Sequence, residues 1–99
     1  QAGEVVGRTV LYAGRPVEKS RQELNEFLQL TNSDIIDHLR VEDNQLMILW
    51  VSQADYDQAV AKLVAAKVNQ AVRVVASSNI VYGEPVIAKL ELYPNYLVY

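Results

Sequence analysis

The sequence predicts an α+β fold, an α/β sandwich in which two helices pack on one mixed β-sheet. Segments rich in β-branched and aromatic residues alternate with segments whose apolar residues recur every three or four positions, in the order β-α-β-α-β-β. The last two strand-like segments, residues 71–76 and 86–92, are separated by turn-forming residues and are expected to form a meander. With 99 residues, of which 51% are hydrophobic, the chain supports one core, so we expect a single domain over residues 1–99.

The first strand is expected over residues 4–13, which are rich in Val, Thr, Leu and Tyr and are followed by the turn residues 14–16. Gly7 interrupts this segment. A glycine inside a strand more often marks a bulge or the close approach of another backbone than a ligand site. We therefore expect a bulge or a close contact at Gly7.

An amphipathic helix is expected to begin at Val17, directly after Pro16, because apolar residues then follow at helical spacing on one face. That face carries Leu24, Phe27, Leu28 and Thr31. Residues 31–33 are poor helix formers, so either one long helix runs through them or a second short helix begins with Ser33 as its cap. We favour the break.

The second strand is expected within residues 45–51, a nearly continuous apolar run that is typical of a central strand covered on both faces. Ser52, with Asp55 three residues later, resembles a capping box. A second helix should therefore begin there and continue to about Lys67, with Asn69 as its end.

The segment 86–92 alternates strictly, which predicts a strand with one dry face and one mixed face. The dry face carries Val86, Ala88, Leu90 and Leu92. Two helices packed on that face would leave the other face of the sheet partly bare. Residues 96–99 are a candidate for a further strand, which would need a partner such as the strand that begins at Glu4.

The composition excludes several kinds of function. The net charge is −3, from nine Lys and Arg against twelve Asp and Glu, and no basic cluster is present, so nucleic acid is not an expected partner. Without cysteine, the chain has no disulfide, thiolate nucleophile or cysteine-ligated zinc site. No apolar run reaches the roughly 20 residues of a membrane span. Because the chain begins at Gln1 and ends on an apolar stretch, we expect that it was excised from a longer polypeptide.

No pattern of catalytic or cofactor-binding residues emerges, and we assign no catalytic, cofactor-binding or metal residue. The single histidine, His38, lies one helical turn after Asp34, but a solvated helix end explains this pair better than a metal half-site. Residues 77–79 offer hydroxyls without a nucleophile elbow. These observations weigh against an enzyme, although a metal-dependent hydrolase or nuclease stays open as the alternative. Its carboxylates would be Glu4, Asp34, Asp37 and Glu84.

The tyrosines are the most distinctive feature of the composition. Six tyrosines and one tryptophan are present, and four of these seven lie in the last eighteen residues: Tyr82, Tyr93, Tyr96 and Tyr99. Amphipathic rings on a sheet surface can pack at the rim of a small core, which is the simpler interpretation. They can also form an interaction surface for a protein partner or a second copy of the chain.

Three stretches resemble the C-terminal region of an uncharacterised bacterial family that carries a domain of unknown function and is known from cyanobacteria and Firmicutes. They are residues 3–16, residues 72–86 with the pattern V-R-[IV]-[IV]-x-[SA]-x-N-x-V-x-G-E, and residues 94–99 with the pattern P-N-x-[LV]-[VI]-[FY]. The helix motif Leu24-x-x-Phe27-Leu28 accompanies them.

The resemblance implies a longer chain with two N-terminal membrane spans, a coiled coil and this small α/β domain outside the cytoplasm. It implies no catalytic residue. The expected function is therefore a non-enzymatic protein-interaction or self-association module of a larger, envelope-associated protein.

Overall fold

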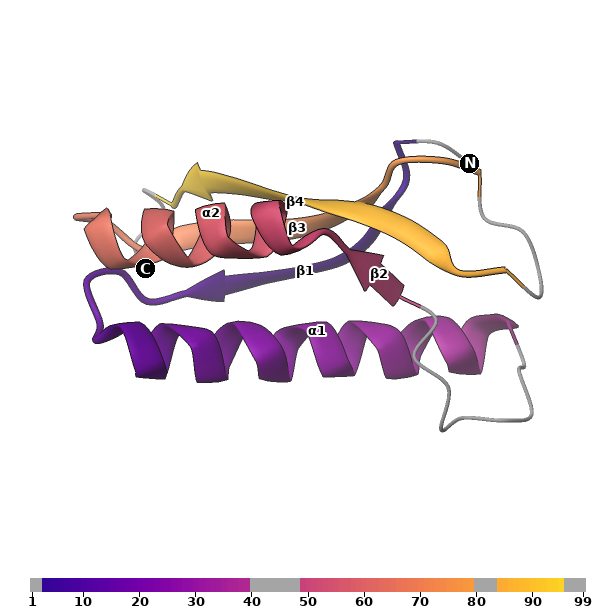
Figure 1. Ribbon diagram of the computed structural model, residues 1–99, viewed down its shortest axis with the longest axis horizontal. Helices are drawn as coiled ribbons and strands as arrows, with labels where there is room; N and C mark the ends of the chain where they lie inside the picture. The colour runs from indigo at the N-terminus through magenta and orange to yellow at the C-terminus, as the bar shows by residue number, and fades with distance from the viewer. Residues whose placement is uncertain (1–2, 40–48, 80–83, 96–99) are drawn as a thin grey trace.

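The computed structural model describes residues 3–39, 49–79 and 84–95 (Figure 1). It confirms the α+β fold and the order of the elements, which are β1 (Val5–Leu11), α1 (Val17–Leu39), β2 (Leu49–Val51), α2 (Gln53–Ala65), β3 (Gln70–Ala76) and β4 (Val86–Pro94). Figure 1 shows α1 running along the whole length of the molecule, with β1 and α2 above it. The candidate strand at residues 96–99 lies outside the described residues.

The four strands form one mixed sheet in the order β1-β3-β4-β2. β3 pairs antiparallel with both β1 and β4, and β2 pairs parallel with β4. The predicted meander of β3 and β4 is therefore confirmed. Along β4 the residues Val86, Ala88 and Leu92 are buried while Ile87 and Tyr93 are exposed, as the alternation predicts. Both helices contribute to the core on the buried face.

The prediction of a central strand within residues 45–51 is wrong for the part that the structure describes. β2 is an edge strand, because β4 lies between it and β3. Leu49 and Val51 pack toward the core, but the side chain of Trp50 points to the opposite, uncovered side of the sheet. Residues 45–48 lie outside the described residues.

The favoured break at residues 31–33 is also wrong, because α1 continues through them to Leu39. Thr31 and Asn32 are buried. Thr31 lies against Gly7 of β1, and the Asn32 side-chain Oδ1 accepts a hydrogen bond of 2.9 Å from the backbone N–H of Leu49. These tertiary contacts outweigh the low helix propensity of the segment. The side chain of His38 lies outside the described residues.

Gly7 lies at a bulge, as predicted, and its close neighbour is the side chain of Thr31, where another backbone was expected. The register of β1 against β3 shifts between Val5 and Gly7, which is a bulge. A Cβ atom added at Gly7 would meet Thr31 Oγ1 at 2.5 Å, which is far closer than van der Waals contact allows. The missing side chain therefore lets α1 approach β1 closely.

α2 begins as predicted. Ser52 is its N-cap, and the Ser52 hydroxyl accepts a hydrogen bond of 3.1 Å from the N–H of Asp55. The helix then runs beside the part of β4 that β2 leaves unpaired, where Lys62 Nζ donates a hydrogen bond of 3.0 Å to the carbonyl of Leu92. It ends at Ala65, slightly before the predicted Lys67.

Candidate functional site: the open face of the sheet

The face of the sheet that the helices leave uncovered is the candidate functional site. We call it the open face and define it by its outward-pointing residues Val10, Trp50, Arg73, Ile87, Glu91 and Tyr93. The strand register places them together. Arg73 pairs directly with Glu91 across β3 and β4, and Trp50 pairs with Ile87 across β2 and β4. Val10 and Tyr93 flank Ala71 from either side, on β1 and β4 respectively.

An ordered polar cluster occupies the middle of the open face. Arg73 Nη2 lies 2.7 Å from Glu91 Oε1 in an ion pair. The Tyr93 hydroxyl donates to the same oxygen at 3.1 Å and accepts from Arg73 Nη2 at 3.2 Å. The guanidinium carbon also lies 5.0 Å from the centre of the Tyr93 ring, a cation–π distance. Three side chains from two strands thus hold one another in place.

These contacts shift the titration of both charged groups. The hydrogen bond from Arg73 lowers the pKa of Glu91 below its ordinary value, and the hydrogen bond from Tyr93 adds to that effect, while desolvation opposes it. The hydrogen bond to Glu91 raises the pKa of Arg73. Glu91 therefore keeps its negative charge to a lower pH than an ordinary glutamate does.

The open face also carries exposed apolar side chains. Trp50 is 55% exposed, Val10 49%, Tyr93 46% and Ile87 44%. Trp50 and Ile87 form a cross-strand pair, so their exposed surfaces are continuous. Exposed apolar area rimmed by polar groups is typical of protein interaction sites, and Trp, Tyr and Arg are the residues that most often dominate their binding energy.

Of the four tyrosines expected to form an interaction surface, the structure places Tyr93 on the open face. Tyr82, Tyr96 and Tyr99 lie outside the described residues. Sequence reasoning missed Trp50, because the apolar run around it indicates burial on both faces. It also missed the Arg73–Glu91 pair, since nothing in the sequence fixes the register of β3 against β4.

The alternative site, a cluster of carboxylates for a metal ion, has no counterpart in the part of the chain that the structure describes. No three or more His, Asp or Glu side chains there are arranged to hold a metal ion. Within the same residues, no helix has both the length and the hydrophobicity of a membrane span.

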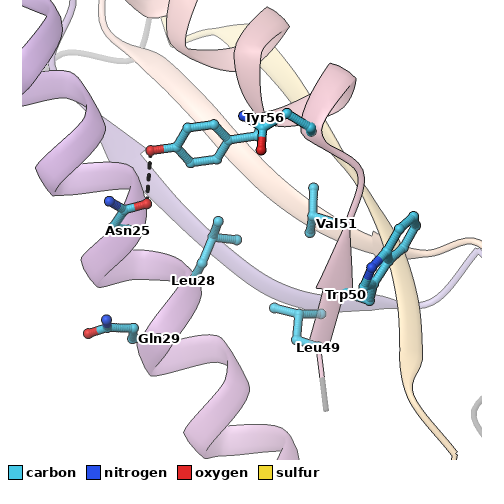
Figure 2. Close-up of a pocket in the computed structure, with 8 residues that line it drawn as sticks. Asn25, Leu28, Gln29, Leu49, Trp50, Val51 and Tyr56 are labelled. Carbon is cyan, nitrogen blue, oxygen red and sulfur yellow. Dashed lines mark hydrogen bonds between the residues drawn. The ribbon is translucent and has the colours of Figure 1, made fainter. Parts of the chain in front are cut away.

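A groove lies between α1, β2 and the first turn of α2 (Figure 2). Its volume is about 380 Å³. We call it the β2 groove and define it by the residues that line it: Asn25, Leu28, Gln29, Leu49, Trp50, Val51, Gln53 and Tyr56. Figure 2 shows the Tyr56 ring reaching across to α1, where its hydroxyl donates a hydrogen bond of 2.9 Å to Asn25 Oδ1.

Comparisons with known proteins identify no related protein. The chain matches no protein-family model, no curated protein and no solved structure. Its function must therefore be inferred from the chemistry of the open face and the β2 groove.

Proposed function

We propose that this domain is a non-enzymatic protein-interaction module that docks a protein partner, or a second copy of the chain, on its open face. The observation that carries this proposal is the continuous apolar surface of Trp50 and Ile87 on the same sheet face as an ordered Arg73–Glu91 pair, with Lys89 between them on β4. A sheet face that served only to complete the fold would be expected to carry dispersed polar side chains.

Burial of this surface would supply a useful part of a binding energy. An aromatic side chain can bury 150–250 Å², so the exposed half of Trp50 amounts to roughly 100 Å². At about 25 cal/mol per Å², its burial contributes about 2.5 kcal/mol. Ile87, Val10 and Tyr93 would add to this in proportion to their exposed area.

The polar cluster of Arg73, Glu91 and Tyr93 would fix the orientation of the docked partner. Arg73, Glu91 and Tyr93 already hold fixed positions through their mutual hydrogen bonds, so docking costs little additional side-chain entropy. Arg8, the β1 neighbour of Arg73, and Lys89 are both exposed and add positive charge. This chemistry favours a partner surface that combines apolar side chains with carboxylates.

We further propose that the domain acts within a larger envelope-associated chain, on the outer side of the membrane. The resemblance of residues 3–16, 72–86 and 94–99 to a membrane-tethered family supports this context. A tether raises the effective concentration of neighbouring copies, so even a small interface would be occupied.

Two matched substitutions test the proposal. Ile87→Lys places a charge in the apolar part of the open face, and Leu30→Lys makes the same chemical change at a 66% exposed position on α1. The readout is co-purification of a differently tagged second copy, or of another protein, with the full-length chain from its own cells. We expect Ile87→Lys to reduce retention about tenfold, which corresponds to ~1.4 kcal/mol, and Leu30→Lys to retain the partner. Equal retention by the two variants, or no partner at all, would refute the proposal.

A further inference from the structure

We propose a second binding site, which borders the open face at Trp50: the β2 groove captures an extended, uncharged peptide segment, which adds to the sheet as a strand beside β2. Strand addition requires an accessible sheet edge with unpaired backbone groups, and neighbouring side-chain pockets that give specificity. Among the residues that the structure describes, β2 offers both.

The edge comes from the sheet order and from one hydrogen bond. Within residues 3–39, 49–79 and 84–95, β2 is paired on one side only, with β4. The N–H of Leu49 donates to Asn32 Oδ1 of α1, so it points away from β4. Backbone groups alternate sides along a strand. The N–H and C=O of Val51 therefore also point away from β4, toward the groove between β2 and α1.

The polar side chains around the groove complement a peptide backbone. Asn25 Oδ1 accepts the hydroxyl of Tyr56, so the amide nitrogen is the end of Asn25 that remains to donate. Gln53 Nε2 donates to Asp57 Oδ1 at 2.9 Å, which leaves the Gln53 carbonyl oxygen as the acceptor. Gln29 lies one helical turn beyond Asn25 (Figure 2). Donors and acceptors thus line the same groove as Val51.

The lining also determines the charge of the occupant. None of its eight residues carries a charge, so a charged ligand would lose hydration without gaining an opposite charge. Leu28, Leu49 and Val51 form an apolar floor that suits one aliphatic side chain of the segment (Figure 2). The volume of about 380 Å³ is near the lower end for ligand sites and holds a short segment. A neutral peptide with alternating aliphatic and hydroxyl side chains meets all of these conditions.

The test is an NMR titration of the ¹⁵N-labelled domain with the blocked peptide Ac-Thr-Val-Thr-Val-Thr-NH₂. We expect saturable shifts of the Val51 amide and of the side-chain amides of Asn25 and Gln29, with no shift at Tyr93 on the open face. The same peptide N-methylated at every residue should bind at least about tenfold more weakly, because it cannot donate to the edge of β2.

A substitution in the protein provides the reciprocal test. Val51→Pro removes the edge N–H without touching the ladder to β4, a position where an edge strand tolerates proline. We expect about tenfold weaker peptide binding, while Val51→Ile, which keeps the N–H, binds normally. Equal binding of the two peptides, or no saturable shift in the groove, would overturn the inference. The peptide comparison uses the wild-type domain, so it decides the question even if Val51→Pro does not fold. The open-face proposal is tested separately at Ile87, which does not line the groove, although Trp50 borders both sites.

Discussion

Gly7→Ala tests the packing of α1 on β1 at the point where the sequence favours a helix break. The added Cβ would lie 2.5 Å from Thr31 Oγ1, 2.9 Å from its Cγ2 and 3.3 Å from its Cβ. Carbon atoms in contact lie about 3.5–4.0 Å apart, so α1 or β1 must move by about 1 Å. Overpacking of this kind costs ~1–3 kcal/mol. Gly7 has no positive φ, so Ala gains about 0.5–1 kcal/mol by restricting the unfolded chain, and the net destabilisation should be roughly 1–2 kcal/mol.

The assay for Gly7→Ala is urea unfolding followed by circular dichroism, with the double variant Gly7→Ala/Thr31→Ala as a rescue. Thr31→Ala removes both of the nearest atoms, so the double variant should be more stable than the sum of the single effects by about 1 kcal/mol. Thr31→Ala alone is the matched control. The reasoning fails if Gly7→Ala is as stable as the wild type, or if Thr31→Ala does not relieve its effect.

Substitutions at three further positions test other contacts by the same unfolding assay. Asn32→Ala leaves the buried N–H of Leu49 without its acceptor and should destabilise the domain by ~1–3 kcal/mol; an effect near zero would mean that this bond does not anchor β2 to α1. Ser52→Ala removes the N-cap of α2 and should cost about 0.5–2 kcal/mol, whereas Ser52→Asp should be nearly neutral. Glu91→Gln should make the free energy of unfolding depend less on pH under acid conditions. Arg73 lowers the pKa of Glu91 in the folded state. The ion pair therefore stabilises the fold fully above the ordinary carboxyl pKa of about 4.5, and this stabilisation is lost as the pH falls through the lowered pKa of Glu91. An unchanged pH dependence in Glu91→Gln would show that the ion pair does not stabilise the fold.

Local sequence patterns predicted the elements whose burial follows a strict period. The alternation in residues 86–92 identified the two faces of β4, and Ser52 with Asp55 marked the start of α2. Both signals act over a few residues and do not depend on the rest of the chain. The antiparallel pairing of β3 and β4 followed because the two strands are adjacent in sequence.

Predictions failed where distant residues decide the outcome. Residues 31–33 favour a helix end, but Thr31 and Asn32 gain contacts with β1 and β2, and these contacts keep α1 continuous. The run at residues 45–51 indicated a central strand, yet pairing of β4 with β3 places β2 at the edge and exposes Trp50. Both errors share one cause, which is that non-local contacts override local propensity.

In the candidate site, too, local patterns were predicted correctly and contacts between distant residues were missed. Tyr93 was identified from the tyrosine-rich end of the chain, and the alternation of β4 placed it with Glu91 on the mixed face. Arg73 joins them only through the register of β3 against β4, and Trp50 only through the parallel pairing of β2. An interaction surface built from four strands cannot be assembled from sequence periodicity alone.

The most direct test of the open face as an interface is site-specific photo-crosslinking in the full-length protein in its own cells. A benzophenone amino acid replaces Ile87, which pairs with Trp50 on the open face, and in a second sample it replaces Leu30, which is exposed on α1. We predict a discrete protein adduct from position 87, with a second copy of the chain or with another protein, and none from position 30. The absence of an adduct at position 87, or adducts of equal yield at both positions, would contradict the assignment of the open face.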